Sequence, residues 1–378
     1  MPEFSADAGR AESGCCFFLT TARSDDNVYV IVIKRIFGII MASMKEIADI
    51  AKVSVATVSR VVNKTMRVND ETRVRVERAI SDLGYRPNLL ATGLRSKSGN
   101  IIGLSIPKVL PTVIGYTEEV VRHHNYSLIV GNTHNDPAEE ADFIDKLVRR
   151  NVDGIIFSQV SDKSTSVDIL RKAGIPFVVI DRGRPDCDDA TVMTDNYTAG
   201  KLAAIHLTSL GHERCVCVTG PPDISLCRER LRGFKDALTE RKRNFEDRDA
   251  YVGDFTIEAG MEAAKHFLET NDSFTAVWAE NDLMAIGFMN ALLDRGYRVP
   301  DDFSVAGMDD IEASGMVRPR LTTVRQDFKE ICRLAVAMLL EMKAGRTLPS
   351  RRVIVPVDLL IRESTGRPST RASLPPGV

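Results

Sequence analysis

Small apolar, hydroxyl-bearing and basic side chains lie close together in sequence between residues 54 and 63. Val55 and Ala56 suit contact with the methyl groups of thymines, and Arg60, about one helical turn further on, could reach a guanine. Short hydroxyl and amide groups accompany them and suit phosphate oxygens, which fix orientation without reading sequence; these are Ser54, Thr57, Ser59 and Asn63. The pattern therefore indicates contact with double-stranded DNA. The alternative is a helical hairpin packed inside a larger helical core.

Three short helices are expected to position these side chains. Lys45 to Ala51 and Val55 to Asn63 both have amphipathic helical spacing, and Ser54 can cap the second of them. Asn69 is expected to cap a third helix that ends at Gly84. Two short helices joined by a tight turn form a helix-turn-helix, which places its second helix in the major groove of DNA.

The distribution of charge divides the chain into a basic front and an acidic body. The whole sequence has a net charge of -2, which argues against a chain devoted only to nucleic acid. Residues 41–100, however, contain eleven Lys and Arg against six Asp and Glu, a net charge of +5, so the remainder carries -7. This asymmetry indicates a DNA-facing module attached to a second domain, unless the basic residues cluster by chance.

The segments around the predicted helix-turn-helix have weaker patterns. Residues 88–99 can form a short linker helix, but Thr92 and Gly93 weaken it. Residues 1–40 contain an apolar stretch that is too short to span a bilayer, and they lack a signal-peptide layout. A buried strand is one interpretation, but we favour a non-native or disordered extension. Residues 367–378 are rich in Pro and Ser and are expected to be a disordered tail.

The rest of the chain alternates short apolar runs with helical stretches. The runs are IIGLSI, SLIVGN, DGIIFS, FVVID, TVMTD, CVCVTG, AVWAEND and FSVAGMDD. This alternation predicts βαβ units and parallel sheets, and the number of strands favours two lobes of a doubly wound α/β domain over residues 100–366. Lobe 1 should comprise residues 100–194 and 327–355, and lobe 2 residues 195–326 and 356–366. In such folds a ligand binds at the carboxyl ends of the strands.

Polar side chains at the predicted strand ends could bind a small molecule between the lobes. The candidates are Asp181, Arg230, Asn281 and Asp309. Planar hydrogen-bonding groups suit hydroxylated ligands, and Arg230 could bind a carboxylate, a phosphate or paired hydroxyls through two N–H groups. Alternatively, the aspartates cap helices and Arg230 forms a structural ion pair.

No pattern of a catalytic or metal site is evident in the sequence. The seven cysteines show no CxxC spacing and are odd in number, which favours reduced thiols in a cytoplasmic protein. We find no GxSxG, no P-loop and no GxGxxG after a strand. Asp181 and Asp309 could form an acid pair, but the two lobes of a binding cleft use the same chemistry without turnover. We therefore expect no catalytic residue, no metal and no cofactor, although the fold alone does not exclude an enzyme.

The string from Lys45 to Asn63 resembles the signature of the LacI family of bacterial repressors, as do Val68, Thr72 to Val74 and Leu83 to Asn88. The resemblance implies that residues 41–87 form the DNA-binding domain. It implies that Val55, Ala56 and Arg60 read bases and that the following residues contact the DNA backbone: Ser54, Thr57, Ser59, Asn63, Thr72, Tyr85 and Asn88. It further implies that the linker becomes helical on DNA.

Leu94 in that linker matches the family leucine that inserts into the minor groove at a central base step. Such a wedge unstacks bases but bends the duplex onto more protein surface. The alternative is an ordinary core residue of a linker helix. A single helix-turn-helix reads few base pairs, so we expect a homodimer, formed through the α/β body, on a pseudo-palindromic operator.

Residues 100–366 resemble the periplasmic sugar-binding fold carried by the same family, through strings such as Asn151 to Ile156 and Gly307 to Asp310. The resemblance implies that Phe255 and Phe328 pack on the ligand, although both could be core residues. It implies a repressor controlled allosterically by a sugar, a sugar derivative or a nucleoside.

Other functions remain as alternatives. They are a regulator that requires its ligand and, less expected, an α/β enzyme or a solute-binding protein. The run Ile106 to Val113 is shorter than the corresponding loop of most family members. Either the effector is unusual or lobe 1 contacts it weakly.

Overall fold

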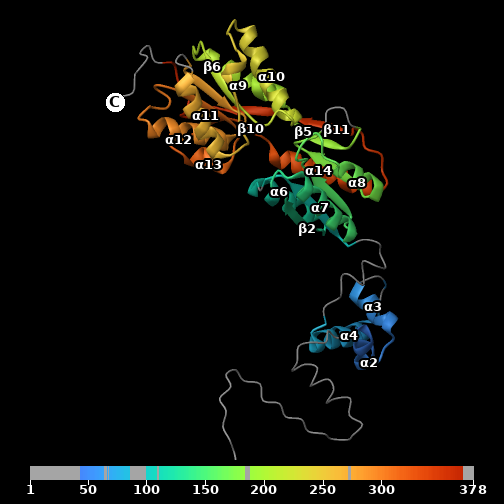
Figure 1. The fold of residues 1–378 in the computed structure, drawn as a ribbon. Helices are drawn as coiled ribbons and strands as arrows, with labels where there is room; N and C mark the ends of the chain where they lie inside the picture. The colour runs from blue at the N-terminus through green and yellow to red at the C-terminus, as the bar shows by residue number, and fades with distance from the viewer. Residues whose placement is uncertain are drawn as a thin grey trace, which may run out of the picture. The chain divides into compact units, whose positions relative to one another are not determined.

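The computed structural model describes residues 43–63, 66, 68–85, 99–108, 110–183, 188–270 and 274–368. Residues 1–89 and 90–378 form two compact units, unit 1 and unit 2, and each is described by itself (Figure 1). The predicted N-terminal extension, the linker helix with Asn88 and Leu94, and most of the predicted tail lie outside the described residues.

The described part of unit 1 contains three helices, as the sequence predicts. They are α2 (Met44–Ala51), α3 (Val55–Asn63) and α4 (Asp70–Leu83). Their inward faces share one small core of buried apolar side chains, against which partly buried residues such as Met44, Val61 and Leu83 pack. The core residues are Ile47, Ala48, Ala51, Val58, Val76 and Ala79. The helix-turn-helix therefore rests on a core of its own.

The helix ends of unit 1 follow from local capping chemistry. The hydroxyl of Ser54 accepts a hydrogen bond from the backbone N–H of Thr57 at 3.1 Å and so caps α3. The Asn69 side chain accepts from the backbone N–H of Glu71 at 2.9 Å at the start of α4. Gly84 ends α4 with a φ of 59°, a left-handed conformation that glycine adopts without strain. These three predicted caps are confirmed.

Unit 2 contains two six-stranded sheets (Figure 1). The first sheet has the order β11-β5-β4-β3-β1-β2, and the second has the order β12-β10-β9-β8-β6-β7. All pairings are parallel except that of β10 with β12. The first sheet comprises β1 (Ile101–Ile106), β2 (Ser127–Asn132), β3 (Gly154–Phe157), β4 (Phe177–Ile180), β5 (Thr191–Thr194) and β11 (Arg352–Val355). The second comprises β6 (Cys215–Thr219), β7 (Ala250–Val252), β8 (Ala276–Ala279), β9 (Ser304–Asp309), β10 (Thr322–Gln326) and β12 (Val357–Leu360).

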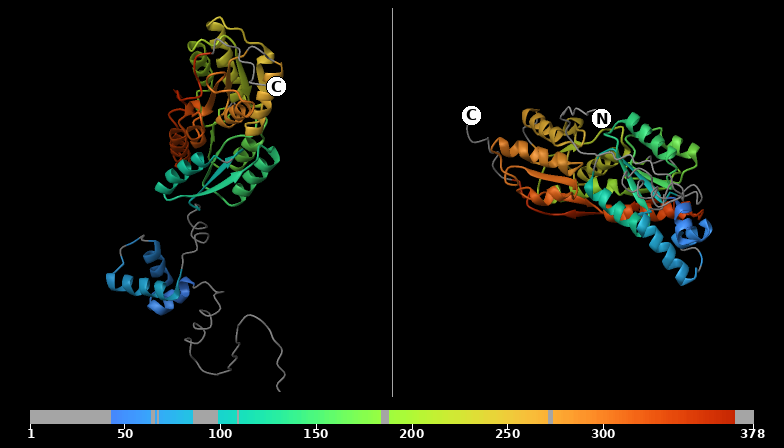
Figure 2. Two further views of the ribbon diagram at one scale, coloured as in Figure 1. Left: turned by 90° about the vertical axis from the view of Figure 1, so that its left-hand side faces the viewer. Right: turned by 90° about the horizontal axis from the view of Figure 1, so that it is seen from below.

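Helices cover both faces of each sheet, which confirms the doubly wound α/β prediction (Figure 2). The first sheet, with its helices, is lobe 1: α6 (Pro111–His123) and α14 (Phe328–Lys343) cover one face, α7 (Pro137–Arg149) and α8 (Ser166–Ala173) the other. The second sheet is lobe 2: α9 (Asn196–Ser209) and α10 (Ser225–Glu240) cover one face, α11 (Ile257–Thr270) and α12 (Asp282–Asp294) the other. A short helix, α13 (Glu312–Met316), follows β9, and a 3-10 turn (Asp247–Asp249) precedes β7.

The chain passes between the two sheets three times, after β5, after β10 and after β11. Hydrogen bonds join these crossings: the Thr194 hydroxyl donates to the Gln326 side chain, and the Asp195 N–H donates to the Val355 carbonyl at 3.0 Å. The three crossings therefore form one connected hinge between the lobes.

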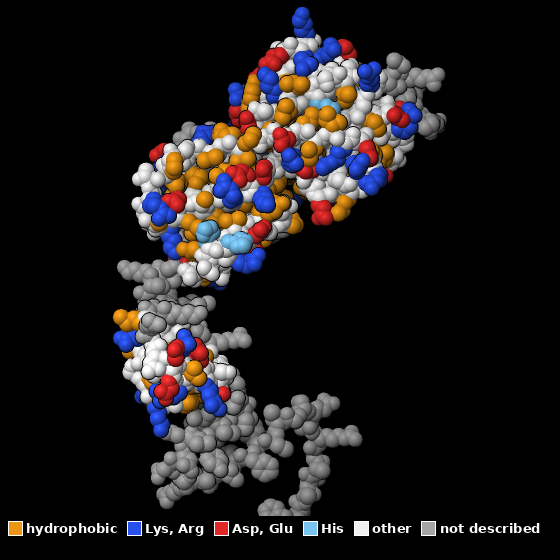
Figure 3. All heavy atoms as spheres, turned by 180° about the vertical axis from the view of Figure 1, so that it is seen from behind, with side chains coloured by type: hydrophobic (Ala, Val, Ile, Leu, Met, Phe, Trp, Pro, Cys, Tyr) orange, Lys and Arg blue, Asp and Glu red, His pale blue; other side chains and the backbone are white. Residues whose placement is uncertain are grey.

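The visible surface of unit 2 mixes acidic, basic and apolar side chains over both lobes (Figure 3). Many of its arginines pair with carboxylates, for example Arg320 with Glu363 at 2.8 Å and Arg325 with Asp358 at 2.9 Å. Across the described ranges, we find no helix that combines the length and the apolar character needed to cross a membrane.

Candidate ligand cleft and DNA-contact helix

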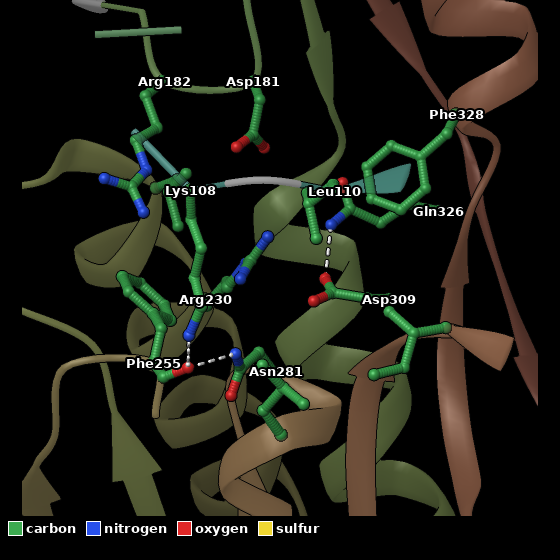
Figure 4. Close-up of a pocket in the computed structure, with 13 residues that line it drawn as sticks. Lys108, Leu110, Asp181, Arg182, Arg230, Phe255, Asn281, Asp309, Gln326 and Phe328 are labelled. Atoms are coloured by element: carbon green, nitrogen blue, oxygen red, sulfur yellow. Dashed lines mark hydrogen bonds between the residues drawn. The ribbon is translucent and has the colours of Figure 1, made fainter. Parts of the chain in front are cut away.

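A cleft lies between the two lobes of unit 2, at the carboxyl ends of their strands (Figure 4). Its empty volume is about 560 Å³, the open mouth included. Lobe 1 lines it with residues that follow β1 and β4 and with the start of α14, and lobe 2 with α10 and the segments that end β7, β8, β9 and β10. The lining residues are Lys108, Leu110, Asp181, Arg182, Leu226, Arg230, Phe255, Asn281, Leu283, Asp309, Ile311, Gln326 and Phe328.

All six residues that the sequence suggested as ligand contacts line this one cleft, although they come from six different segments. Three of them have left-handed backbones: φ is 57° at Asp181, 68° at Phe255 and 119° at Asp309. Such conformations are uncommon outside glycine and concentrate at binding and catalytic sites. The structure thus brings the predicted set together, while their contact with a ligand stays a prediction.

Arg230 is held rigidly at one wall of the cleft. The side chain is 3% exposed; its Nε donates to Asn196 Oδ1 at 2.8 Å and its Nη1 to the Glu280 carbonyl at 2.6 Å. This arrangement depends on a close approach of α9 and α10, because a Cβ at Gly200 would lie 1.9 Å from the Arg230 carbonyl oxygen. The guanidinium group extends into the cleft (Figure 4).

The two aspartates of the cleft differ in their surroundings. Asp309 accepts a hydrogen bond from Gln326 Nε2 at 2.6 Å, and burial raises the pKa of its carboxyl to about 7, although Arg230 opposes this shift. Asp181 Oδ1 is buried and has no hydrogen-bond partner among the residues that the structure describes. Both carboxylates face the interior of the cleft (Figure 4), where each can accept a hydrogen bond from a ligand.

Asn281 uses both groups of its side chain within the protein. Its Oδ1 accepts from the Met284 N–H at 2.9 Å and caps α12, while its Nδ2 donates to the Phe255 carbonyl at 3.1 Å. Lys108 Nζ of lobe 1 donates to the same carbonyl at 3.0 Å, and the Arg182 guanidinium lies 5.0 Å from the centre of the Phe255 ring. Phe255 is therefore a point where lobe 1 contacts lobe 2.

A second set of hydrogen bonds joins the lobes at the start of α10. The helix has no capping side chain of its own at Ile224. Instead, Asp162 of lobe 1 accepts from the Ser225 N–H at 3.2 Å and from Arg228 Nη2 at 2.7 Å. The Ser225 hydroxyl donates to the Gly183 carbonyl at 3.1 Å. Opening of the lobes would break these bonds and leave the end of α10 uncapped.

Seven lining residues are absent from the sequence-based candidates, and three of them are polar: Lys108, Arg182 and Gln326. Lys108 comes from the shortened run Ile106 to Val113, which contributes to the cleft through Lys108 and Leu110. The signal that identified Asp181 could have found Lys108, which follows β1, and Arg182, which follows β4. It could not have found Gln326, because no apolar run indicates β10.

In unit 1, helix α3 presents different side chains to the core and to solvent. Val58 is fully buried, whereas Val55 is 45% exposed and Ala56 and Arg60 are also exposed. Ser54 is exposed, with its hydroxyl 2.9 Å from that of Thr57. Four further predicted backbone contacts, Thr57, Ser59, Thr72 and Tyr85, are half-buried, while Asn63 ends α3 and its side chain lies outside the described structure. The predicted base-reading residues thus share the solvent-facing side of α3.

Comparisons with known proteins match both units. Residues 43–88 match the family model of bacterial regulatory proteins, lacI family, and residues 204–365 match a periplasmic binding protein-like domain. The chain is 32% identical over 329 residues to the HTH-type transcriptional repressor PurR of Mannheimia succiniciproducens, covering 86% of this chain and 98% of the relative. It is 32% identical over 329 residues to the HTH-type transcriptional repressor CytR of Escherichia coli, covering 86% and 96%.

Solved structures give the same result. The lac repressor dimer bound to operator and the anti-inducer ONPF has a TM-score of 0.79 at 27% identity, covering 86% of this chain and 100% of that one. The complex of the transcriptional regulator CelR with cellobiose has a TM-score of 0.67 at 27% identity, covering 85% and 99%.

Proposed function

The chain belongs to the LacI family of bacterial regulatory proteins, and on that premise we propose that it represses transcription by binding an operator, with an affinity set by a small molecule in the cleft. It is a regulator and not an enzyme. The proposed binding to DNA is supported mainly by one observation: Val55, Ala56 and Arg60 are exposed on one face of α3. An apolar side chain such as Val55, left 45% exposed beside an arginine, suits a thymine methyl beside a guanine.

Two copies of the chain bind a pseudo-palindromic operator, because one α3 reaches too few base pairs for useful specificity. The homodimer forms through unit 2. Ser54, Thr57, Ser59, Asn63, Thr72, Tyr85 and Asn88 contact the DNA backbone, and Leu94 enters the minor groove. The similar lac repressor structure is a dimer bound to operator, which supports this arrangement. A bacterial repressor meets its operator in the cytoplasm, and we assign the protein to that compartment.

The effector, a sugar, a sugar derivative or a nucleoside, acts by changing how the lobes close. Asp181, Arg230, Asn281 and Asp309 supply polar contacts from both lobes, and Phe255 and Phe328 supply apolar faces. The hydrogen bonds of Asp162 and Lys108 already join the lobes, so a ligand that strengthens or replaces them shifts the balance of lobe positions. The coupling to DNA affinity is typically about 1–3 kcal/mol.

A substitution on α3 tests the DNA half of this proposal. An operator is first selected from a random duplex library with the full-length protein. We expect Arg60→Ala to weaken binding to that operator by about ten-fold or more, because a bidentate guanine contact provides about 1–3 kcal/mol of discrimination. Leu94→Ala should also weaken it. Arg78→Ala, on the exposed surface of α4, is the control and should bind normally. Fluorescence anisotropy measures each affinity.

Two outcomes would contradict the proposal. The first is a wild-type protein that prefers no duplex over random DNA, with or without candidate metabolites. The second is an Arg60→Ala variant that loses affinity equally for the operator and for random DNA, because such a loss would mean that Arg60 reads no base.

A further inference from the structure

We propose that the effector carries an oxyanion, a phosphate or a carboxylate, which Lys108, Arg182 and Arg230 bind together in the cleft. This inference rests on the proposed function, because it takes the cleft as the effector site. It narrows the range of sugars, sugar derivatives and nucleosides to their acidic forms.

The first observation is that the three cations of the cleft bind only uncharged acceptors. Arg182, which is 8% exposed, donates through Nη1 to Asn135 Oδ1 at 2.9 Å and to the Val160 carbonyl at 3.4 Å. Arg230 donates to an amide oxygen and a backbone carbonyl, and Lys108 to a backbone carbonyl. Within the described ranges, none of the three forms an ion pair with a carboxylate.

Partly buried arginines elsewhere in unit 2 behave differently. Arg214 pairs with Asp249 at 2.8 Å, and Arg362 pairs with Asp310 at 2.5 Å. A buried cation without a counter-charge is costly, because burial removes its hydration and neutral acceptors replace it only in part. The cleft is therefore a place where an anion from outside would be favourable.

The second observation is that donors remain available for such an anion. A guanidinium has five N–H groups and an ammonium has three. The contacts above use only Nη1 of Arg182, only Nε and Nη1 of Arg230, and one hydrogen of Lys108. Two guanidinium groups can therefore each donate further hydrogen bonds to one oxyanion, the geometry in which charge-assisted bonds are strongest.

The acidic residues of the cleft do not cancel these three charges. Burial raises the pKa of Asp309 to about 7, so its carboxyl is partly protonated at neutral pH. Glu280, directly behind the cleft wall, has a pKa raised by burial to about 8 and is mostly neutral there. Asp181 remains as the principal opposing charge, and its unpartnered Oδ1 can accept from a hydroxyl or amino group of the same ligand.

The cations come from both lobes. Lys108 and Arg182 follow strands of lobe 1 and Arg230 lies on α10 of lobe 2, and Figure 4 shows Lys108 extending beside Arg230 toward Phe255. An oxyanion held by all three would stand between the lobes and could replace the bond from Lys108 to the Phe255 carbonyl. Binding of the acidic group would thus act directly on lobe closure.

Matched neutral and acidic probes test the inference. The full-length protein is titrated calorimetrically, at constant ionic strength, with glucose and glucose 6-phosphate, ribose and ribose 5-phosphate, uridine and uridine 5′-monophosphate, and galactose and galacturonate. Inorganic phosphate and acetate are tested as competitors. We expect at least one acidic probe to bind about ten-fold or more tightly than its neutral partner. Competition by phosphate or by acetate identifies which oxyanion the site prefers.

Lysine variants assign the effect to the cleft. Lys108→Met should lower the affinity for the acidic probe by about ten-fold more than it lowers the affinity for the neutral partner. Lys172→Met, which removes the same charge from the exposed surface of α8, should change neither. A Lys108→Met variant that loses both probes equally, or keeps both, would overturn the inference.

The remaining outcomes separate this inference from the proposed function. If a neutral probe binds as tightly as its acidic partner and alters operator affinity, the proposed function stands and the oxyanion site is wrong. If no acidic probe binds, inorganic phosphate included, the oxyanion site is also wrong. If an acidic probe binds through Lys108 but leaves operator affinity unchanged, the oxyanion site stands and the proposed control of DNA binding fails.

Discussion

Glu280 directly follows the strand β8, in surroundings that disfavour its charge. The side chain is fully buried; Oε2 accepts from the Gly220 N–H at 2.8 Å, but Oε1 has no partner among the described residues. Burial raises the pKa of Glu280 from 4.5 to about 8, and the nearby Arg230 only partly opposes that shift. Folding therefore favours the protonated acid over its carboxylate.

This pKa predicts a dependence of stability on pH. Between about pH 5 and pH 8 the folded protein holds a proton on Glu280 that the unfolded chain has already lost, so the free energy of unfolding falls as the pH rises. Each pKa unit corresponds to about 1.4 kcal/mol. We therefore expect the free energy of unfolding of the wild-type protein to fall by at least about 2 kcal/mol over this range, and we expect this fall to be absent in Glu280→Gln. Urea denaturation at a series of pH values measures it.

The effect of Glu280 on stability is best measured between pH 6.5 and pH 8, where His212 does not contribute. Burial lowers the pKa of His212 from 6.5 to about 4, so the unfolded chain binds a proton that the folded protein lacks, and stability rises with pH below 6.5. Asp309, with a pKa of about 7, adds a slope of the same sign as Glu280. Glu262→Gln, on the exposed surface of α11, is the control. An unchanged slope in Glu280→Gln would disprove the assignment.

Individual residues that line the cleft were predictable where their type is unusual at a strand end. Asp181, Asn281 and Asp309 follow apolar runs directly, and a doubly wound fold gathers such ends at one edge. Lys108 and Arg182 have the same placement, but a lysine or arginine after a strand is ordinarily a solvated surface residue. Only the packed structure reveals that their partners are neutral oxygens and that Arg182 is buried.

At the scale of elements, two helix pairs of lobe 2 pack through reciprocal glycines. A Cβ at Gly200 of α9 would lie 1.9 Å from the Arg230 carbonyl oxygen, and one at Gly233 of α10 would lie 2.0 Å from that of Tyr197. In the same way, a Cβ at Gly260 of α11 would lie 2.1 Å from a carbonyl oxygen of α12. The backbones therefore approach more closely than any other residue allows, and this approach brings Asn196 within reach of Arg230.

We expect Gly200→Ala to separate α9 from α10 and to withdraw Arg230 from the cleft. The clash is with backbone, which cannot rotate away, so the variant should lose about 1–3 kcal/mol or more of stability. It should also bind effector weakly even where it remains folded. Thermal unfolding and calorimetric titration measure the two effects.

A second glycine provides the control for that helix pair. Gly115 lies in α6, and a Cβ there would meet no atom within 4 Å. Gly115→Ala should therefore stabilise the protein by about 0.5–1 kcal/mol through its effect on backbone entropy. Normal stability and normal effector binding in Gly200→Ala would refute the proposed role of the close approach.

The elements themselves were predictable to different degrees. Helix ends with a side-chain cap or a glycine, such as those at Asn69 and Gly84, lie where local chemistry predicts. The strands β7, β10, β11 and β12 were missed. β7 has only three residues, and β11 and β12 lie in one apolar stretch that Pro356 divides. In β10, Thr322, Thr323 and Gln326 are buried through hydrogen bonds rather than apolar contact, so no apolar run indicates the strand.

At the scale of the whole molecule, the division into two units has a thermodynamic consequence. Unit 1 has its own buried core around Val58, and unit 2 has separate cores on both faces of each sheet. The sequence indicated this division through the charge asymmetry around residue 100 and the change from helical to alternating patterns. It provided no measure of how independent the units are, because that depends on packing.

We predict that the two units unfold in separate transitions, with the smaller unit 1 melting first because a small core contributes less stability. Removing two methyl groups from a fully buried valine costs about 2 kcal/mol, so Val58→Ala should lower the first transition by about 10 °C and leave the second in place. Val216→Ala, in the core of lobe 2, is the matched substitution and should lower only the second.

Differential scanning calorimetry with ligands then connects the two units to the two functions. A ligand stabilises only the unit that binds it, so operator DNA should raise the first transition and a cleft ligand the second. When both are bound, any change in one transition caused by the other ligand measures the coupling between the sites. A single transition that both valine substitutions lower equally would show that the two units unfold together. Control of DNA binding would then require a rigid connection between the units rather than two separately folded parts.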